Sequence, residues 1–170
     1  MESEGTMLRQ SFTYQLASIA EDAVRPPARL FELRFGLNVH DLRVLRLIDD
    51  QPGVTFTSLA KQTKFERSAT SRILSRLIKA KLVRREIDED DARHFRLFVT
   101  EAGVALRSKA DPLSLEMEAL ILSALTEGER SEFRRMLDKL SGWLATEFPE
   151  QLARRYPDAA APVRRKRQQG

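Results

Sequence analysis

One predicted helix, over residues 67–81, has a face whose side chains could bind nucleic acid. With residues placed 100° apart, hydroxyl and basic side chains fall within an arc of about 100°, namely Ser68, Ser71, Arg72, Ser75 and Lys79. Apolar side chains occupy the opposite side: Ala69, Ile73, Leu74, Leu77 and Ile78. Small hydroxyls beside an arginine let a helix approach base edges closely while donating hydrogen bonds to phosphates and guanine. The pattern therefore favours a helix that enters a major groove over a solvated face, where glutamate would be expected.

The charge around this helix is strongly positive. Nine basic residues and one acid, Glu66, lie between Lys61 and Arg85, although the net charge of the whole chain is only +4. The distribution matters more than the total, because a local cationic face attracts phosphates. Surface helices are also rich in lysine and arginine for solubility alone, so charge by itself leaves both interpretations open.

The neighbouring elements predict a helix-turn-helix followed by a wing. Asn38 is a good N-cap for a helix that ends at Pro52-Gly53. A short helix over residues 55–63 and a turn at 64–66 precede the basic helix. Residues 82–100 then alternate apolar and polar side chains on both sides of a charged loop, as expected for two strands with one buried face. Residues 38–100 are called the winged unit below.

Long helices are predicted on both sides of the winged unit. Before it, an amphipathic helix runs to Pro26-Pro27, where we expect a kink or a break. After it, a helix from about Glu101 contains Pro112, and Thr126 with Glu129 forms a capping box that opens a last helix. That last helix carries an apolar stripe: Phe133, Met136, Leu137, Leu140, Trp143, Leu144 and Phe148. A compact three-helix unit cannot cover such a stripe, so we expect a homodimer through the terminal helices, with packing inside one subunit as the alternative.

The expected fold is mainly α with a small β-wing: a winged helix-turn-helix plus N- and C-terminal dimerisation helices. The expected divisions are an N-terminal helical dimerisation segment (residues 1–37), a winged helix-turn-helix DNA-binding domain (38–100), C-terminal dimerisation helices (101–148) and a flexible basic tail (149–170). Two-fold symmetry then predicts a pseudo-palindromic operator with half-sites about 10 base pairs apart.

Several segments resemble the MarR family of bacterial regulators. Three are similar to the wing of that family: Leu82-Val83-Arg84-Arg85, Asp91-Ala92-Arg93 and Val99-Thr100-Glu101-Ala102-Gly103. Two more are similar to its recognition helix and to the helix before the turn: Ser68-Ala69-Thr70-Ser71-Arg72-Ile73-Leu74 and Leu59-Ala60. The resemblance extends to about Phe148. One departure is Lys81, where family members commonly have glycine.

The resemblance implies a homodimeric winged-helix protein that binds double-stranded DNA, usually as a repressor. Its recognition helices would enter successive major grooves, and wing arginines would enter the minor groove. Arg93 would then be the minor-groove residue and Asp91 the carboxylate that orients it, with a weak surface ion pair as the alternative for these two. The full set of predicted DNA contacts is Arg67, Ser68, Thr70, Ser71, Arg72, Ser75, Arg76, Lys79, Asp91 and Arg93.

The resemblance also implies a small aromatic or phenolic effector, bound between the dimer helices and the winged unit. The residues that could supply aromatic walls and a partner for a carboxylate are Phe12, Phe31, Arg34, Phe35 and Arg46. For each of them, an ordinary place in the core or on the surface is the alternative.

The composition argues against metal, redox and catalytic functions. The chain has no cysteine and two histidines, His40 and His94, which excludes disulfides and leaves few metal ligands. The acidic residues 88–91 lack the glycine and the glutamate that a calcium loop requires at fixed positions. No phosphate-binding glycine loop, zinc-protease motif or nucleophile elbow occurs in the sequence. We therefore expect a protein without enzymatic activity, metal or cofactor.

The sequence shows no secretion signal and no apolar run of about 20 residues, so we expect a cytoplasmic protein without a membrane partner. The alternative function is a winged-helix adaptor that docks an acidic protein through the same basic face and does not bind DNA. An RNA-binding domain is less well supported, because the exposed aromatic surface that such domains use for stacking is missing.

Overall fold

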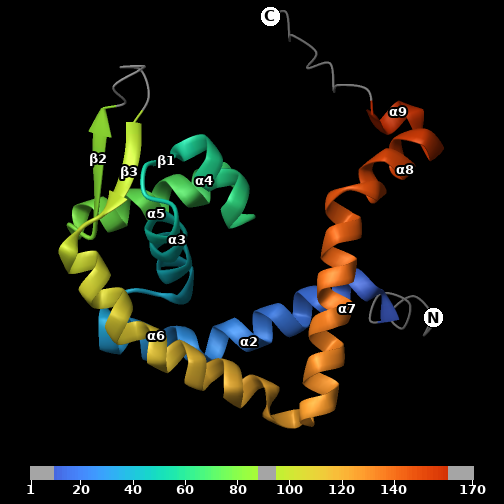
Figure 1. Ribbon diagram of the computed structural model, residues 1–170, viewed down its shortest axis with the longest axis horizontal. Coiled ribbons are helices and arrows are strands. Elements are labelled where there is room, and N and C mark those ends of the chain that lie inside the picture. The colour runs from blue at the N-terminus through green and yellow to red at the C-terminus, as the bar shows by residue number, and fades with distance from the viewer. Residues whose placement is uncertain (1–9, 88–94, 161–170) are drawn as a thin grey trace, which may run out of the picture. The chain divides into compact units, whose positions relative to one another are not determined.

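The computed structural model describes residues 10–87 and 95–160, and the chain divides into two compact units, Met1–Ile121 and Leu122–Gly170 (Figure 1). Each unit is described by itself. The first contains the predicted helix-turn-helix, its wing and the long helix on either side, and the second contains the C-terminal helices.

The first unit begins with α2 (Phe12–Phe35), a helix of 24 residues that includes Pro26 and Pro27. Of the kink or break expected at these prolines, the break is wrong, because the helix is continuous, and the kink stays a prediction. Proline lacks a backbone N–H but has a helical φ, so a helix held by its neighbours can continue through it. Those neighbours are α3 and α6, and Phe31 is buried in the shared core just beyond the prolines. The helix ends at Gly36, whose left-handed backbone (φ 68°) lets its N–H bond the Glu32 carbonyl at 2.9 Å.

The predicted helix-turn-helix and the helix before it are present as α3 (Val39–Asp50), α4 (Phe56–Thr63) and α5 (Arg67–Lys79). Asn38 caps α3 as expected, because its side chain accepts the backbone N–H groups of His40 and Asp41, each at 2.9 Å. The Asp41 carboxylate accepts the Asn38 N–H in return, at 3.3 Å. Fully buried aliphatic side chains from all three helices form the core: Leu42, Leu45, Ile48, Leu59 and Leu77. This core fixes which side of α5 faces outward.

The wing belongs to an antiparallel sheet with strand order β1-β3-β2, built from β1 (Val54–Thr55), β2 (Val83–Ile87) and β3 (Phe95–Val99). The hairpin of β2 and β3 confirms the predicted wing, whereas the two-residue β1 is not evident in the sequence. Val83 and Leu97 are buried, but Ile87 and Phe95 near the open end are 63% and 47% exposed. The expectation that one whole face of the hairpin is buried is therefore wrong, because only its base reaches the helices.

The helix after the wing, α6 (Glu101–Ile121), contains Pro112 as predicted and packs along α2 and α3 (Figure 1). Its first turn approaches the base of the wing very closely. A Cβ added at Gly103 would lie 2.3 Å from the Leu82 carbonyl oxygen and 2.5 Å from a Cγ atom of Val99, so only glycine fits there. The Thr100 hydroxyl donates to the Lys81 carbonyl at 2.7 Å and completes this junction.

The second unit contains a short 3₁₀ turn, Leu122–Ala124, followed by α7 (Glu127–Ala145), α8 (Glu147–Arg155) and α9 (Pro157–Ala160). The capping box of Thr126 and Glu129 is present. Residues 149–155 and 157–160 of the expected flexible tail are helical, and residues 161–170 lie outside the described residues, so the flexibility of the tail stays a prediction. No side chain of α7 or α8 is buried, and the predicted apolar stripe is half-exposed, with Phe133 at 38% and Met136 at 49%.

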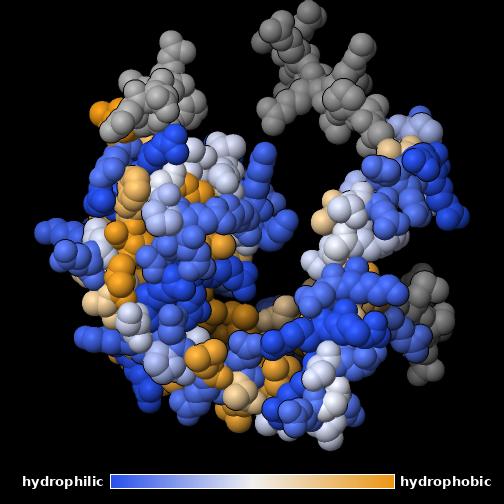
Figure 2. Space-filling model, in the orientation of Figure 1, coloured by the Kyte–Doolittle hydropathy of each residue, from blue (hydrophilic) through white to orange (hydrophobic). Residues whose placement is uncertain are grey.

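The surface of the first unit is uneven in character. In Figure 2, hydrophilic side chains predominate over α3, α4 and α5, while hydrophobic patches lie along α6, where Val104, Leu115 and Leu120 are exposed. Within residues 10–87 and 95–160, no helix combines the length and hydropathy needed to cross a membrane.

Candidate nucleic-acid interface

α5 presents the polar face that the sequence predicts. Its buried side chains are Thr70, Ile73, Leu74 and Leu77. Basic and hydroxyl side chains are left exposed: Arg67, Ser68, Ser71, Arg72, Ser75, Arg76 and Lys79. The helix contains no acid. The structure thus brings the predicted contacts on α5 together at one surface, with the exception of Thr70.

Thr70 faces the turn between α4 and α5. Its hydroxyl lies 3.0 Å from the hydroxyl of Thr63, and both residues are buried. Thr63 also accepts the backbone N–H of Phe65 at 3.3 Å, within a turn where Lys64 has a left-handed backbone (φ 59°). Thr70 therefore lies away from the exposed face of α5, and its hydroxyl ties the two helices together. Sequence reasoning missed Thr63, for which the only signal is a hydroxyl on the inward side of α4.

Arg76 is exposed but its guanidinium has an internal partner. Nη2 lies 2.5 Å from Oδ1 of Asp41, the buried capping residue of α3. This ion pair joins the recognition helix to the first turn of α3, so it fixes how α5 is rotated on the core. Arg76 lies beside the predicted contacts, but its charge is largely balanced within the protein.

A cleft of about 360 Å³ runs between α5 and the base of the wing. Polar and basic side chains from α5, the wing and the start of α4 line it, including Thr57, Arg67, Ser71, Ser75 and Arg85. The Arg67 guanidinium lies over the ring of Phe56, 4.7 Å from its centre, which holds a flexible side chain at the mouth of the cleft. The Ser75 hydroxyl donates to the Ser71 carbonyl at 2.9 Å, so its lone pairs remain available to a donor.

The wing carries arginines that are held against aromatic rings. The guanidinium of Arg84 lies 4.8 Å from the centre of the Phe98 ring, and that of Arg85 lies 6.0 Å from the centre of the Phe95 ring. Arg84 also pairs with Glu86. Asp91 and Arg93, the predicted wing contacts, lie outside the described residues, so the structure neither supports nor opposes them.

The five residues predicted to bind an effector do not form one pocket within a chain. Phe12 and Phe31 are 19 residues apart on the same helix, which corresponds to about 28 Å. Phe31 is buried against Phe35, with ring centres 5.8 Å apart, while Arg34 is exposed. Within one chain these side chains belong to the core or to an open surface, and the effector site expected between the dimer helices and the winged unit stays a prediction.

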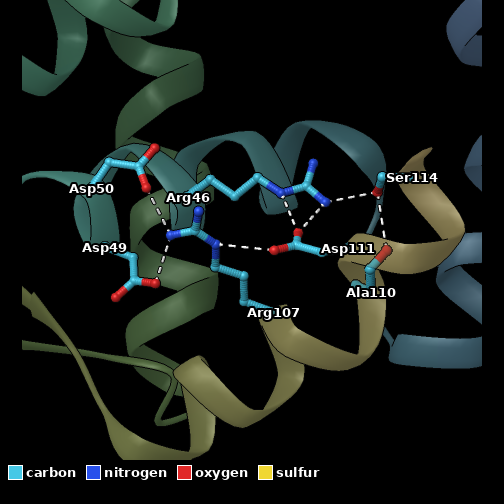
Figure 3. Close-up of polar contacts among 7 residues, drawn as sticks. All are labelled: Arg46, Asp49, Asp50, Arg107, Ala110, Asp111 and Ser114. Carbon is cyan, nitrogen blue, oxygen red and sulfur yellow. Dashed lines mark hydrogen bonds and ion pairs between the residues drawn. The ribbon is translucent and has the colours of Figure 1, made fainter. Parts of the chain in front are cut away.

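Arg46, the fifth residue of that set, is committed to α6. Its Nη2 lies 2.6 Å from Oδ1 of Asp111 and donates to the Ser114 hydroxyl at 2.7 Å (Figure 3). A guanidinium held in this way is not free to receive a ligand carboxylate.

A different hollow, of about 430 Å³ and mainly apolar, lies between α2 and the first turn of α3. Ala20, Val24 and Val39 contribute apolar walls, and His40 and Arg43 supply polar groups. Burial and the positive charge of Arg43 lower the pKa of His40 below its usual value, which Asp41 partly opposes. Among the described residues, no group of three side chains could hold a metal ion.

An exposed basic helix, supported by two helices and followed by a β-hairpin, defines a winged helix-turn-helix protein. The model of the MarR family matches residues 35–94 of this chain.

Named relatives are similar to the chain over a longer stretch. The HTH-type transcriptional repressor Rv2887 of Mycobacterium tuberculosis is 28% identical over 117 residues, which are 69% of this chain and 84% of that protein. A crystal structure of Rv2887 with salicylic acid matches with a TM-score of 0.63 at 27% identity, over 76% of this chain and 96% of that one. The S. aureus MepR-DNA complex matches with a TM-score of 0.69 at 23% identity, over 78% of this chain and 97% of that one, which supports the fold alone.

Proposed function

We propose that this chain is a sequence-specific DNA-binding transcriptional regulator, a ligand-responsive repressor that binds a pseudo-palindromic operator as a homodimer. The observation that carries the proposal is the exposed face of α5. Seven basic and hydroxyl side chains lie there without an acid, on a helix whose other side is locked into the core. Such a face is suited to contact phosphates and base edges at once.

The dimensions of this face fit a duplex. The 13 residues of α5 correspond to a helix of about 20 Å, and the major groove, about 12 Å wide, admits one helix. Hydroxyl side chains on the outer face leave room for close approach, and Arg72 is long enough to reach a guanine. Arg67 and Arg85 border the cleft beside the helix, where they are placed to bind phosphates.

Self-association is supported by the second unit. The apolar stripe of α7 is exposed in one chain, as are Leu152 of α8 and Tyr156 just after that helix. An exposed apolar surface of this extent is typical of an interface between proteins. A second copy of the same stripe would cover it in an isologous contact and would present two copies of α5 to one duplex.

Small aromatic acids are the effector class that we propose. Support comes from the relative Rv2887, which has been crystallised with salicylic acid, and from the hollow between α2 and α3. That hollow offers apolar walls for a ring and Arg43 for a carboxylate. Salicylate should release the protein from DNA, and an Arg43→Ala variant should need a higher salicylate concentration for the same release.

Footprinting on the DNA upstream of the chain's own gene tests the main proposal. We expect protection of a pseudo-palindrome, and Arg72→Ala should weaken binding by about 1 to 3 kcal/mol with relaxed sequence preference. Lys109→Ala, which removes one positive charge from exposed α6 surface, is the matched control and should bind normally. An adaptor that docks proteins would protect no such site, and equal effects of the two variants would show that only total charge matters.

A further inference from the structure

A group of charged side chains connects α3 to α6 (Figure 3). Nη1 of Arg107 lies 2.6 Å from Asp49 and 2.8 Å from Asp50, both at the end of α3. Its Nε lies 3.3 Å from Asp111 on its own helix. Asp111 also accepts Nε of Arg46, at 2.8 Å, so the two arginines share one carboxylate. These five residues are called the α3–α6 ion cluster.

The position of the two acids on α3 is unfavourable without α6. Asp49 and Asp50 lie at the C-terminal end of a helix, where the macrodipole is negative and carboxylates are destabilised. They also repel each other. Arg107 relieves both effects at once, because the N–H groups of its Nη1 donate to both carboxylates. The placement of these acids therefore depends on how α6 lies against α3.

Three side chains of the α3–α6 ion cluster are partly shielded from solvent. The side chains of Arg107, Asp49 and Arg46 are 24%, 25% and 28% exposed. Burial lowers the pKa of Arg107, but hydrogen bonds to Asp49 and Asp50 outweigh this effect and leave that pKa above its ordinary value. Both guanidiniums are planar and make directional bonds, so they restrict rotation as well as distance. Apolar packing alone would hold the two helices together but would allow them to slide.

At its N-terminal end, α3 also contacts α5. Asp41, in the first turn of α3, binds Arg76 of α5 at 2.5 Å. A directional contact thus links α6 to α3 and a second one links α3 to α5. The orientation of α5 relative to α6 is set through α3, by contacts at both ends of that helix.

We propose that Arg107, together with Arg46, is a positioning residue that sets the angle of the winged unit on α6 and thereby the separation of the two recognition helices on an operator. The inference rests on the proposed homodimeric DNA binding. Neither arginine touches DNA in this account. They select the spacing of the half-sites, which the residues of α5 cannot do alone.

Operators that differ only in half-site spacing test this role. One added or removed base pair shifts a half-site by about 3.4 Å and turns it by about 34°. Starting from the footprinted operator, the spacing is changed by one and two base pairs, and affinities are measured with the full-length protein. The variants are Arg107→Ala and Asp111→Asn, with Arg107→Lys as the conservative change and Lys109→Ala as a control on the same helix. Titration at high DNA concentration gives the active fraction of each protein.

We expect the wild type and Lys109→Ala to prefer the native spacing by about tenfold or more over a change of one base pair. Arg107→Ala and Asp111→Asn should reduce that ratio to about threefold or less, and Arg107→Lys should lie between. If the affinity ratio stays unchanged while the affinity falls equally at all spacings, or while the active fraction falls, the proposal is overturned in favour of a purely structural role. A wild type that binds no spacing specifically would instead refute the proposed homodimeric recognition, and the positioning role with it.

Discussion

Gly103 provides a sharp test of how the wing is attached to the rest of the molecule. In Gly103→Ala, the new methyl group would lie 2.3 Å from the Leu82 carbonyl oxygen, about 1 Å closer than ordinary van der Waals contact, which begins at 3.4 Å. Overpacking of this kind costs about 1 to 3 kcal/mol. Moving α6 away would also stretch the bond from the Thr100 N–H to that carbonyl, now 3.0 Å, at about 1 kcal/mol.

Alanine is the better helix former by about 1 kcal/mol, which offsets part of this cost. The net loss in the free energy of unfolding should be about 1 to 3 kcal/mol, or about 2 to 12 °C in Tm for a chain of this size. Urea and thermal unfolding at one fixed protein concentration measure it. Fixed concentration matters because self-association would shift both midpoints.

Gly142 is the matched control for this substitution. It lies inside α7, where an added methyl group would have no heavy atom within 4 Å, and by helical geometry it is opposite the apolar stripe. Gly142→Ala should therefore stabilise the protein by about 0.5 to 1 kcal/mol. Because the obstructing atom at Gly103 is a backbone oxygen, Val99→Ala should not restore stability to Gly103→Ala. If Val99→Ala fully restored the stability of Gly103→Ala, or if Gly103→Ala were as stable as the wild type, the contact with the Leu82 carbonyl oxygen would not be what requires glycine at position 103.

Three further predictions concern single side chains. Lys81→Gly should raise the free energy of unfolding by about 1 kcal/mol, because Lys81 has a φ of 58° that glycine adopts without strain; a lower urea midpoint would contradict this. Burial and Arg43 lower the pKa of His40 in the folded protein below 6.5, so just below pH 6.5 the unfolded chain binds more protons than the folded one. The free energy of unfolding should therefore fall as the pH drops from 6.5 through the lowered pKa. His40→Gln should weaken that fall, and an identical pH profile would count against it. Arg76→Ala should leave the salt dependence of DNA binding unchanged, since its charge is balanced internally, whereas Lys79→Ala should reduce the slope by about 0.9; equal slopes for the two variants would refute the distinction.

Much of the fold follows from local patterns in the sequence. The caps at Asn38 and Thr126, the two faces of α5 and the alternation of the wing each involve residues within a few positions of one another. Their physics is local: helical and strand periodicity, and hydrogen bonds to the first turn of a helix. For that reason the elements, their order and the identity of the polar face could be predicted without coordinates.

The partners of individual polar side chains could not be predicted in the same way. Thr70 and Arg76 have residue types that suit DNA, yet one is bound to Thr63 and the other to Asp41. Arg46 suits a ligand carboxylate, yet it binds a residue 65 positions away in the chain. Such pairings depend on how helices rotate and cross, which periodicity does not specify.

The sequence by itself determined that a basic, hydroxyl-rich helix follows a short helix and precedes a hairpin, because those properties depend on neighbours along the chain. The tertiary structure alone decided which of its polar groups remain available. Burial and directional bonds between distant segments assign Thr70 and Arg76 to the protein's own framework, and they make Gly103 indispensable where two backbones meet. The physical reason is that a side chain's capacity to bind a partner is settled by whatever the fold brings within about 3 Å of it.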